Sequence, residues 1–261
     1  MLISGKLKAA LILSVGLAGL SQVAPAATPV HPDFSGSYVG LGGPGGDSQP
    51  SDQTGFVNTP KLGELFTAAL QPWAKVRADS TNTQIEDMAA ICSFNGPFRH
   101  TNSSPFMWIQ KDDQAYFIPN SLTVVGVIRI FMTDKHPKDI APSWEGHSIG
   151  HWEGDTLVVD TIGFNDQSWL GSENQPHTEA LHLVRRIRMV GDGRIMEIKT
   201  VAEDRRALKH PVEFVRYYRK TDADFAEYVC NEEPGQMREW YDVRQEAVKW
   251  EKTHPPKYED Q

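Results

Sequence analysis

The segment 144–160 carries a serine motif whose surroundings do not suit it. Gly146-His147-Ser148-Ile149-Gly150 matches the G-x-S-x-G nucleophile elbow, in which a strained turn from a buried strand into a helix exposes the serine. Here Pro142 precedes the motif and a strand-forming hairpin follows it, so the sequence lacks the expected strand-to-helix turn. We therefore expect Ser148 to lie on a strand and not to act as a nucleophile.

A loop farther along the chain concentrates groups suited to proton transfer. An imidazole titrates near neutral pH, and a neighbouring carboxylate can hold it in one tautomer. The loop and the hairpin before it supply three histidines and two carboxylates: His147, Asp166, His177, Glu179 and His182. The hairpin should bring residues 161–182 back over the end of the sheet where His147 lies. We therefore expect the three histidines to face one partly apolar cavity, with Asp166 or Glu179 beside them.

The same histidines allow a metal-dependent alternative. Two or three imidazoles with a carboxylate can bind zinc or iron, and the ligands would be His147, His177 and His182. The spacing of His177 and His182 matches no familiar metal motif. No nucleotide cofactor is expected, because no phosphate-binding helix follows the glycine-rich segment 40–46. A reaction without a cofactor is therefore the first hypothesis.

Alternation of apolar and polar residues with a period of two dominates the chain after Cys92 and predicts strands. Turn signals such as Gly191-Asp192-Gly193 separate them. The strands are expected at 33–39, 106–111, 114–119, 123–132, 147–152, 156–164, 181–190, 194–202, 212–220 and 225–230. An antiparallel meander of this length avoids exposed edges best by closing, so we predict a mainly β fold with a lipocalin-like barrel.

Two amphipathic helices are expected to pack outside the barrel. Residues 60–76 carry apolar side chains three and four residues apart, with Thr59 as N-cap and a break at Pro72. A C-terminal helix at 235–252 carries a similar stripe that ends at Trp250.

The turn at Gly154 decides which residues of the 147–161 hairpin share a face. If Gly154 takes the left-handed position of a three-residue turn, His147 lies on the same face as Thr161. Ser148 then lies on the opposite face with Asp160. On this interpretation His147 cannot be the base for Ser148, because neighbours on a strand point to opposite faces.

The N-terminal segment has the features of a secretory signal peptide. Lys6 and Lys8 precede an apolar run at 9–20, and Ala24-Pro25-Ala26 is a small-residue cleavage site. The run is shorter than the ~20 residues needed to span a bilayer. We expect residues 1–26 to be removed, 27–254 to form a single domain and 255–261 to be a disordered tail. The mature chain is expected in the bacterial periplasm or outside the cell.

Charge and cysteine content limit the partners. The chain has 34 acidic against 26 basic residues, which argues against a nucleic-acid partner. No membrane-spanning segment is expected in the mature chain. The two cysteines, Cys92 and Cys230, are expected to form a disulfide in an exported protein. On the chain-entropy model, such a long closed loop stabilises the fold by about 4–5 kcal/mol.

The long motif from Gly146 to Asp166 resembles one found in a large family of exported bacterial proteins of uncharacterised activity. It reads GHSIGHWEGDTLVVDTIGFND. Arginine is expected at the position of His151, which makes His151 the weakest histidine candidate. Tyr38, in the segment 33–39, also resembles the aromatic residue in the opening strand of lipocalin-type (calycin) barrels. Shorter segments similar to the exported family lie at 32–36, 176–177, 180–182 and 227–230.

Two functions remain open. The first is a lyase, isomerase or hydratase acting on a small, largely apolar molecule of aromatic, terpenoid or polyketide-like type inside the barrel. His177 or His182 would be acid and base, and Arg129 or Tyr116 would stabilise developing negative charge. The second is a lipocalin-like carrier without chemistry. The concentration of histidines and carboxylates favours the enzyme, because a carrier has no need of it.

Overall fold

The structure, a computed structural model, describes the part of the chain that was expected to form the barrel. The described residues are 31–41, 55–56, 58–59, 61–87, 94, 96–98, 104–120, 126–171, 174–222 and 249. All of them belong to one unit, which begins at His31. Five predictions lie outside these residues: the signal peptide 1–26, the strand 225–230, the helix 235–252 except Lys249, the tail 255–261 and the Cys92–Cys230 disulfide.

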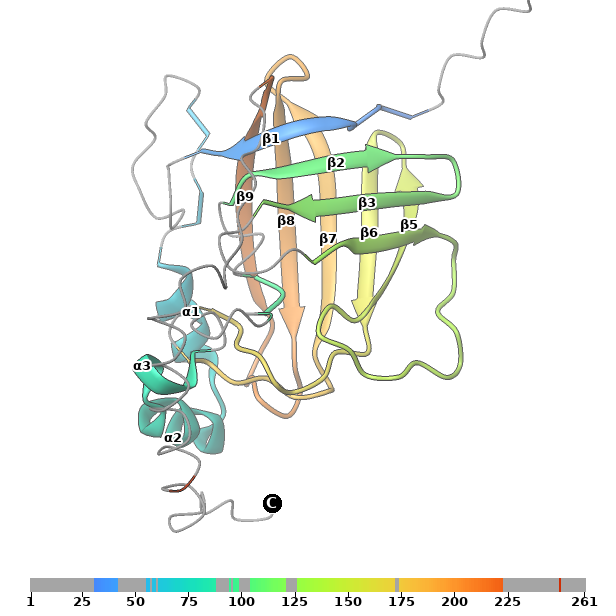
Figure 1. The fold of residues 1–261 in the computed structure, drawn as a ribbon. Coiled ribbons are helices and arrows are strands. Elements are labelled where there is room, and N and C mark those ends of the chain that lie inside the picture. The colour runs from blue at the N-terminus through green and yellow to red at the C-terminus, as the bar shows by residue number, and fades with distance from the viewer. Residues whose placement is uncertain are drawn as a thin grey trace, which may run out of the picture. The chain divides into compact units, whose positions relative to one another are not determined.

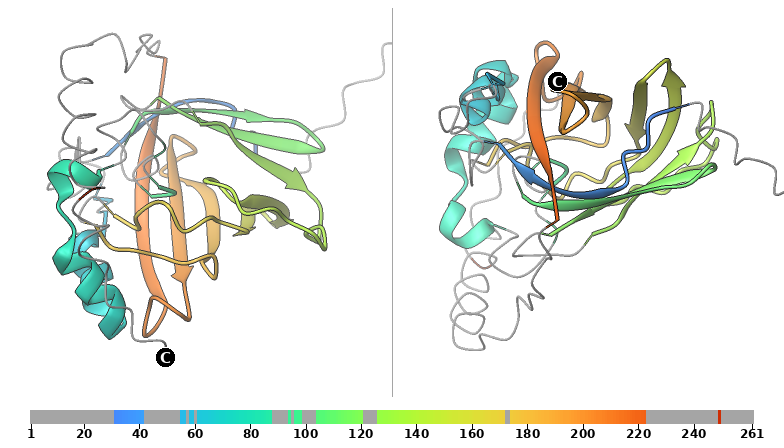
Figure 2. Two further views of the ribbon diagram at one scale, coloured as in Figure 1. Left: turned by 60° about the horizontal axis from the view of Figure 1, so that its bottom comes forward. Right: turned by 90° about the horizontal axis from the view of Figure 1, so that it is seen from above.

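The described strands form a closed barrel in the order β1 to β9, which confirms the predicted fold class (Figures 1 and 2). Each strand follows one of the period-two segments of the sequence. The strands are β1 Gly36–Gly40, β2 Phe106–Gln110, β3 Gln114–Pro119, β4 Ile128–Met132, β5 His147–Glu153, β6 Thr156–Ile162, β7 His182–Val190, β8 Ile195–Glu203 and β9 Val212–Thr221.

One pair departs from the antiparallel meander that the sequence predicted. β4 and β5 run parallel, with Ile130 opposite Ser148, whereas the other neighbouring pairs of described strands are antiparallel. Parallel neighbours cannot be joined by a tight turn. The connection 133–146 therefore leaves the end of β4 and returns to the start of β5, as Figure 1 shows.

The β5–β6 hairpin turns through two residues, where three were expected. Gly154 and Asp155 form the turn, and Gly154 has a φ of 60°, the left-handed conformation that the sequence predicted. Changing the turn by one residue moves side chains to the other face of their partner strand. Ser148 consequently lies opposite Thr161, and both are buried. The expectation that His147 shares a face with Thr161 is therefore wrong.

Inward-facing side chains from most of the strands fill the barrel with apolar groups. Tyr38, Phe106 and Phe117 stack side by side, with ring centroids 5.1 and 4.3 Å apart. Burying an aromatic or large aliphatic side chain stabilises a fold by about 1.5–3 kcal/mol. The other large members of this cluster are Phe34, Trp108, Ile130, Leu157, Val159, Ile187, Met196, Ile198 and Tyr218.

Three helices precede β2: α1 (Leu62–Ala69), α2 (Pro72–Ser80) and α3 (Thr83–Glu86). α2 starts at Pro72, as predicted, because proline lacks an N–H and fits the first turn of a helix. Phe66 of α1 contacts Phe214 of β9, with ring centroids 6.1 Å apart. Residues of α1 and α2 thus belong to a second apolar cluster, at the end of the barrel where β9 begins. No helix in the described part is long and apolar enough to cross a bilayer.

Candidate functional site

Three side chains suited to proton transfer lie on the outward face of neighbouring strands. His147 begins β5, Asp160 lies near the end of β6 and His182 begins β7. Ile162 is opposite His147, and Val184 is opposite Asp160. Asp160 is therefore diagonal to both histidines on one face of the sheet, a separation that long and aromatic side chains can bridge.

The Asp160 carboxylate joins two imidazoles. Its Oδ2 lies 2.7 Å from Nε2 of His182, and its Oδ1 lies 2.8 Å from Nε2 of His136. Nδ1 of His136 in turn lies 2.9 Å from Nδ1 of His147. The result is a continuous hydrogen-bonded chain, His147–His136–Asp160–His182, which we call the relay.

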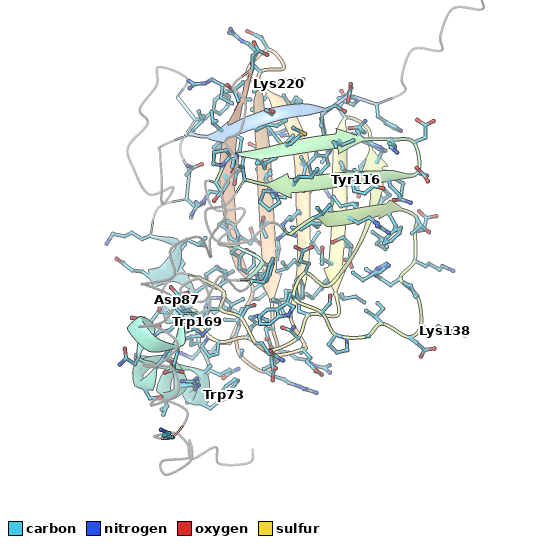
Figure 3. All side chains as sticks on the ribbon, in the orientation of Figure 1. Trp73, Asp87, Tyr116, Lys138, Trp169 and Lys220 are labelled. Atoms are coloured by element: carbon cyan, nitrogen blue, oxygen red, sulfur yellow. The ribbon has the colours of Figure 1, made fainter. Side chains whose placement is uncertain are left out.

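His136 comes from the connection 133–146, whose Lys138 is labelled in Figure 3. The parallel pairing of β4 and β5 makes this long connection necessary, and the connection places His136 over the outer face of the sheet. The side chain of His136 is 14% exposed, whereas those of Asp160 and His182 are 31% and 35% exposed. The relay is therefore shielded at His136 and accessible to a small molecule at His182.

The surroundings of the relay shift two of its pKa values. Burial alone would raise the pKa of the Asp160 carboxyl, but the hydrogen bonds from His182 and His136 outweigh it and lower that pKa. Burial, and then the positive charge that His136 can carry, lowers the pKa of His147. At neutral pH Asp160 is thus an acceptor, and His147 is held in its basic, neutral form.

An aromatic and cationic surface continues the relay beyond His147. The ring of Phe131 stacks on the imidazole of His147, with centroids 5.0 Å apart. The guanidinium of Arg129 lies 5.6 Å from the centroid of Phe131 and 6.0 Å from that of Tyr116, which Figure 3 labels on β3. Arg129 and Tyr116, both named from the sequence, therefore lie on the same surface as His147.

His177 lies elsewhere, in a buried pair with Ser168. Nε2 of His177 is 2.8 Å from the hydroxyl of Ser168, and its Nδ1 is 3.2 Å from the carbonyl oxygen of Thr178. Burial lowers the pKa of His177, and the nearby Thr178 carbonyl, Asp204 and Asp166 do not compensate. No hydrogen bond among the described residues links His177 to the relay. The structure therefore gives it the position of a core residue beneath the loops.

The carboxylates expected beside the histidines occupy the surface. Asp166 and Glu179 are exposed, and neither hydrogen-bonds an imidazole among the described residues. The carboxylate that hydrogen-bonds the histidines is Asp160, where Asp166 or Glu179 had been expected. His151 is also exposed, beside Glu153.

Two members of the relay were not found from the sequence. A two-residue turn at Gly154 would have placed Asp160 on the face of His147, so the turn length was the missing signal for Asp160. The position of His136 beside Asp160 depends on the parallel pairing of β4 and β5, which no sequence pattern indicated.

His177, one of the three ligands suggested for zinc or iron, hydrogen-bonds Ser168 and no member of the relay among the described residues. Among the described residues, no group of three or more His, Cys, Asp or Glu side chains is arranged to hold a metal ion.

Comparisons with known proteins assign no family. No protein-family model matches the chain, and no curated protein matches it. Among solved structures, the chain is similar to one described as "REP1-NXSQ fatty acid transporter", with 9% sequence identity and a TM-score of 0.36. The similarity covers 73% of this chain and 97% of that one.

Proposed function

We propose that the protein is an acid–base enzyme of the lyase, isomerase or hydratase type, and that the relay transfers its protons. One observation carries the proposal: the Asp160 carboxylate lies between two imidazoles, and a third imidazole extends the chain. A carboxylate that fixes the tautomer of a histidine is the usual way to prepare an imidazole for general acid–base catalysis.

The hydrogen-bond pattern defines where protons can enter. Ionised Asp160 only accepts, so Nε2 of both His182 and His136 carries hydrogen. When His136 is neutral, its Nδ1 accepts from Nδ1–H of His147, and Nε2 of His147 is then a base. If that Nε2 takes a proton, the Nδ1 proton can pass to His136, and the positive charge moves next to Asp160.

His182 provides a second position for proton transfer. Its Nε2–H donates a hydrogen bond to Asp160. Its Nδ1 therefore has the lone pair that would accept a proton from a substrate. The carboxylate of Glu203 lies 3.9 Å from this Nδ1. Either imidazole can thus remove a proton from carbon and, once protonated, return that proton to a leaving hydroxyl or to another carbon, which conserves protons over the reaction.

The neighbouring side chains favour a largely apolar substrate with one polar atom. The Phe131 ring offers an apolar surface beside His147, and Arg129 lies over that ring, where it can stabilise developing negative charge. In this arrangement the substrate binds on the outer wall of the barrel. The earlier expectation had placed it inside.

We also propose that the enzyme acts after export, in the periplasm or outside the cell. The signal-peptide features of residues 1–26 support this location, as does the resemblance to the exported family.

A carrier without catalysis is the second candidate. The observation that favours it is a pair of buried arginines in the barrel, Arg185 and Arg216, which the relay does not use.

The test is proton exchange and rearrangement in D₂O. Small terpenoid, aromatic and polyketide-like alcohols and unsaturated ketones are incubated with the mature protein, and mass spectrometry follows deuterium uptake and gain or loss of water. Asp160→Asn should lower the rate for an accepted compound by about 10²–10⁴. Asp166→Asn, which changes an exposed carboxylate outside the relay, should keep it. A wild-type rate in Asp160→Asn would refute the proposal, and loss on chelation with recovery on adding zinc or iron would favour the metal alternative.

A further inference from the structure

The outward face of β2 to β4 carries exposed apolar side chains. Met107 and Ile109 of β2 are 38% and 36% exposed, and Val127, which precedes β4, is 47% exposed. The described residues contain only two other large apolar side chains as exposed as these, Leu65 and Val76, and both lie on the helices. Single exposed apolar residues are common on protein surfaces, whereas several on one face mark a site of interaction.

The register of the strands extends this face to the relay. Ile109 is opposite Tyr116, and Tyr116 is opposite Arg129. Arg129 and His147 each come one residue before the first pair of β4 and β5. Ile109, Tyr116, Arg129 and His147 therefore form a row across four neighbouring strands, which we call the outer row; Figure 3 labels Tyr116 within it. Met107 lies beside this row, two residues from Ile109 on the same face.

The outer row ends at a step in the barrel wall. Ile149 faces outward on β5, yet it is buried. His136 hydrogen-bonds His147, two residues before Ile149, and Asp160, the residue opposite Ile149. The connection 133–146 therefore covers the wall at β5 and β6, whereas the outward side chains of β2 stay exposed. A ligand on the outer row has this step beside the imidazole of His147.

Arg129 places a cation in this otherwise apolar and aromatic row. Its guanidinium lies 6.0 Å from the centroid of Tyr116 and 5.6 Å from that of Phe131, and it forms no ion pair with a described carboxylate. Its N–H groups therefore suit an oxygen atom that carries or develops negative charge. A second copy of the chain fits less well, because a twofold contact sets the same cation against itself. The row matches a ligand with one polar oxygen and an apolar body.

The spacing of the strands sets the length of that body. Neighbouring strands lie about 4.8 Å apart, so Ile109 is about 10 Å from Arg129, across two spacings. An extended alkyl chain advances roughly 1.3 Å per carbon, given C–C bonds of about 1.5 Å. About eight carbons therefore reach from the position of Arg129 to that of Ile109.

We propose that the substrate of the relay is an elongated carbonyl compound whose apolar chain, about eight carbons long, lies along the outer row. Its carbonyl oxygen accepts hydrogen bonds from Arg129, and the neighbouring carbon lies beside Nε2 of His147. The chain then crosses Tyr116 and Ile109. This inference rests on the proposed function and names the substrate class for it.

The chemistry follows from this position. The proton of the carbon next to the carbonyl group passes to Nε2 of His147, and the electrons of the C–H bond form an enolate whose oxygen faces Arg129. The proton then returns to another carbon, which gives an isomer, or to a leaving β-hydroxyl group, which gives water and an unsaturated carbonyl compound. Both sequences conserve atoms and charge and need no further reactant.

The test is binding of saturated 2-alkanones, from 2-pentanone to 2-dodecanone, to the mature protein, measured by NMR. We expect the affinity to rise about twofold per added carbon, as for methylene groups buried on one side, and to level off near 2-decanone. Ile109→Ser should weaken 2-decanone binding at least threefold and leave 2-pentanone binding unchanged. Val76→Ser, which replaces an exposed apolar residue of α2 in the same way, should bind both ketones like the wild type.

Circular dichroism verifies that each variant is folded, and sedimentation reports its oligomeric state. If Ile109→Ser does not fold, Met107→Ser, on the same face of β2, replaces it with the same expectation. An affinity that does not depend on chain length, or an unchanged 2-decanone affinity in the folded variant, would overturn the proposal. A wild-type dimer that dissociates in Ile109→Ser would overturn it in favour of a second copy of the chain.

Hydrogen exchange beside the carbonyl group separates this inference from the proposed function. In D₂O the wild type should exchange the C3 hydrogens of 2-decanone. Asp160→Asn should bind this ketone like the wild type and exchange it about 10²–10⁴ times more slowly. Wild-type exchange in Asp160→Asn, with binding that depends on Ile109, would refute the proposed function and retain the binding surface. Exchange that requires Asp160, with binding that Ile109→Ser does not change, would refute the outer row alone.

Discussion

Asp160 and His182 are 22 residues apart in the sequence, yet Oδ2 of Asp160 lies 2.7 Å from Nε2 of His182. This hydrogen bond joins the ends of two adjacent strands on the outer wall of the barrel. It fixes the His182 tautomer and helps keep Asp160 ionised, so the stability of the fold and the proton transfer that we propose depend on the same two groups.

Acidification should remove the stabilisation that Asp160 provides. The pKa of Asp160 is lower in the folded protein than its ordinary value of 3.8, so the folded state favours the ionised form. This stabilisation is fully present above pH 3.8 and is lost as the pH falls through the folded pKa. The free energy of unfolding, measured with urea between about pH 5 and 2, should fall more steeply with decreasing pH in the wild type than in Asp160→Asn. Asp166→Asn should keep the wild-type slope; identical slopes in wild type and Asp160→Asn would contradict the relay.

The imidazole of His147 should titrate below its ordinary pKa of 6.5. NMR titration measures this midpoint directly. His136→Asn removes a neighbouring positive charge, so the midpoint should rise toward 6.5 without reaching it, because burial remains. Since the folded protein binds this proton less tightly than the unfolded chain, the free energy of unfolding should also decrease as the pH falls below 6.5. A wild-type midpoint at or above 6.5 would be inconsistent with the geometry. The control is His210→Asn, an exposed histidine outside the relay, which should leave the His147 midpoint unchanged.

His177 should matter for stability and not for proton transfer. His177→Ala leaves the buried hydroxyl of Ser168 without its partner and creates a cavity, so unfolding should become easier by about 2–4 kcal/mol. Measured below the new melting temperature, the rate of any reaction should stay within a small factor of wild type. A rate loss of the size expected for Asp160→Asn, without destabilisation, would return His177 to the catalytic candidates.

Ser148 should not react with serine-directed reagents. Its hydroxyl lies inside the barrel, 2.9 Å from that of Thr161, and its backbone belongs to β5. A phosphonate should therefore leave it unlabelled. Ser148→Ala should cost about 1 kcal/mol because Thr161 loses its partner, and adding Thr161→Val should recover part of that loss. Stoichiometric labelling at Ser148 is the result that would disprove this assignment.

The Cys92–Cys230 disulfide and the export of the chain remain predictions from the sequence. Thiol titration of the denatured, unreduced protein should find no free cysteine, and the exported chain should begin near Ala27. Two free thiols in protein isolated from the periplasm would rule out the disulfide.

The barrel was predictable because local patterns specify its elements. β3 has the predicted bounds, and the helix break falls at Pro72. Both were predictable because the alternation of apolar and polar residues and the effect of proline on the backbone depend only on residues close together in the sequence. The site was less predictable because it depends on long-range pairing. His147 and His182 were named from their residue type, but the carboxylate between them depends on the length of one turn. His136 depends on two strands running in the same direction, and no local pattern encodes that.

The parallel pairing of β4 and β5 has a consequence for the order of folding. Short turns join β5 to β6 and β7 to β8, so contacts in this half of the barrel are local and should form early. His147, Asp160 and His182 all belong to these early strands. His136 reaches them only when β4 has paired with β5 and the connection 133–146 packs over the outer face of the sheet. We therefore expect the hydrogen bond from His136 to Asp160 to be among the last to form, which makes the chemistry of the relay a property of the completed fold.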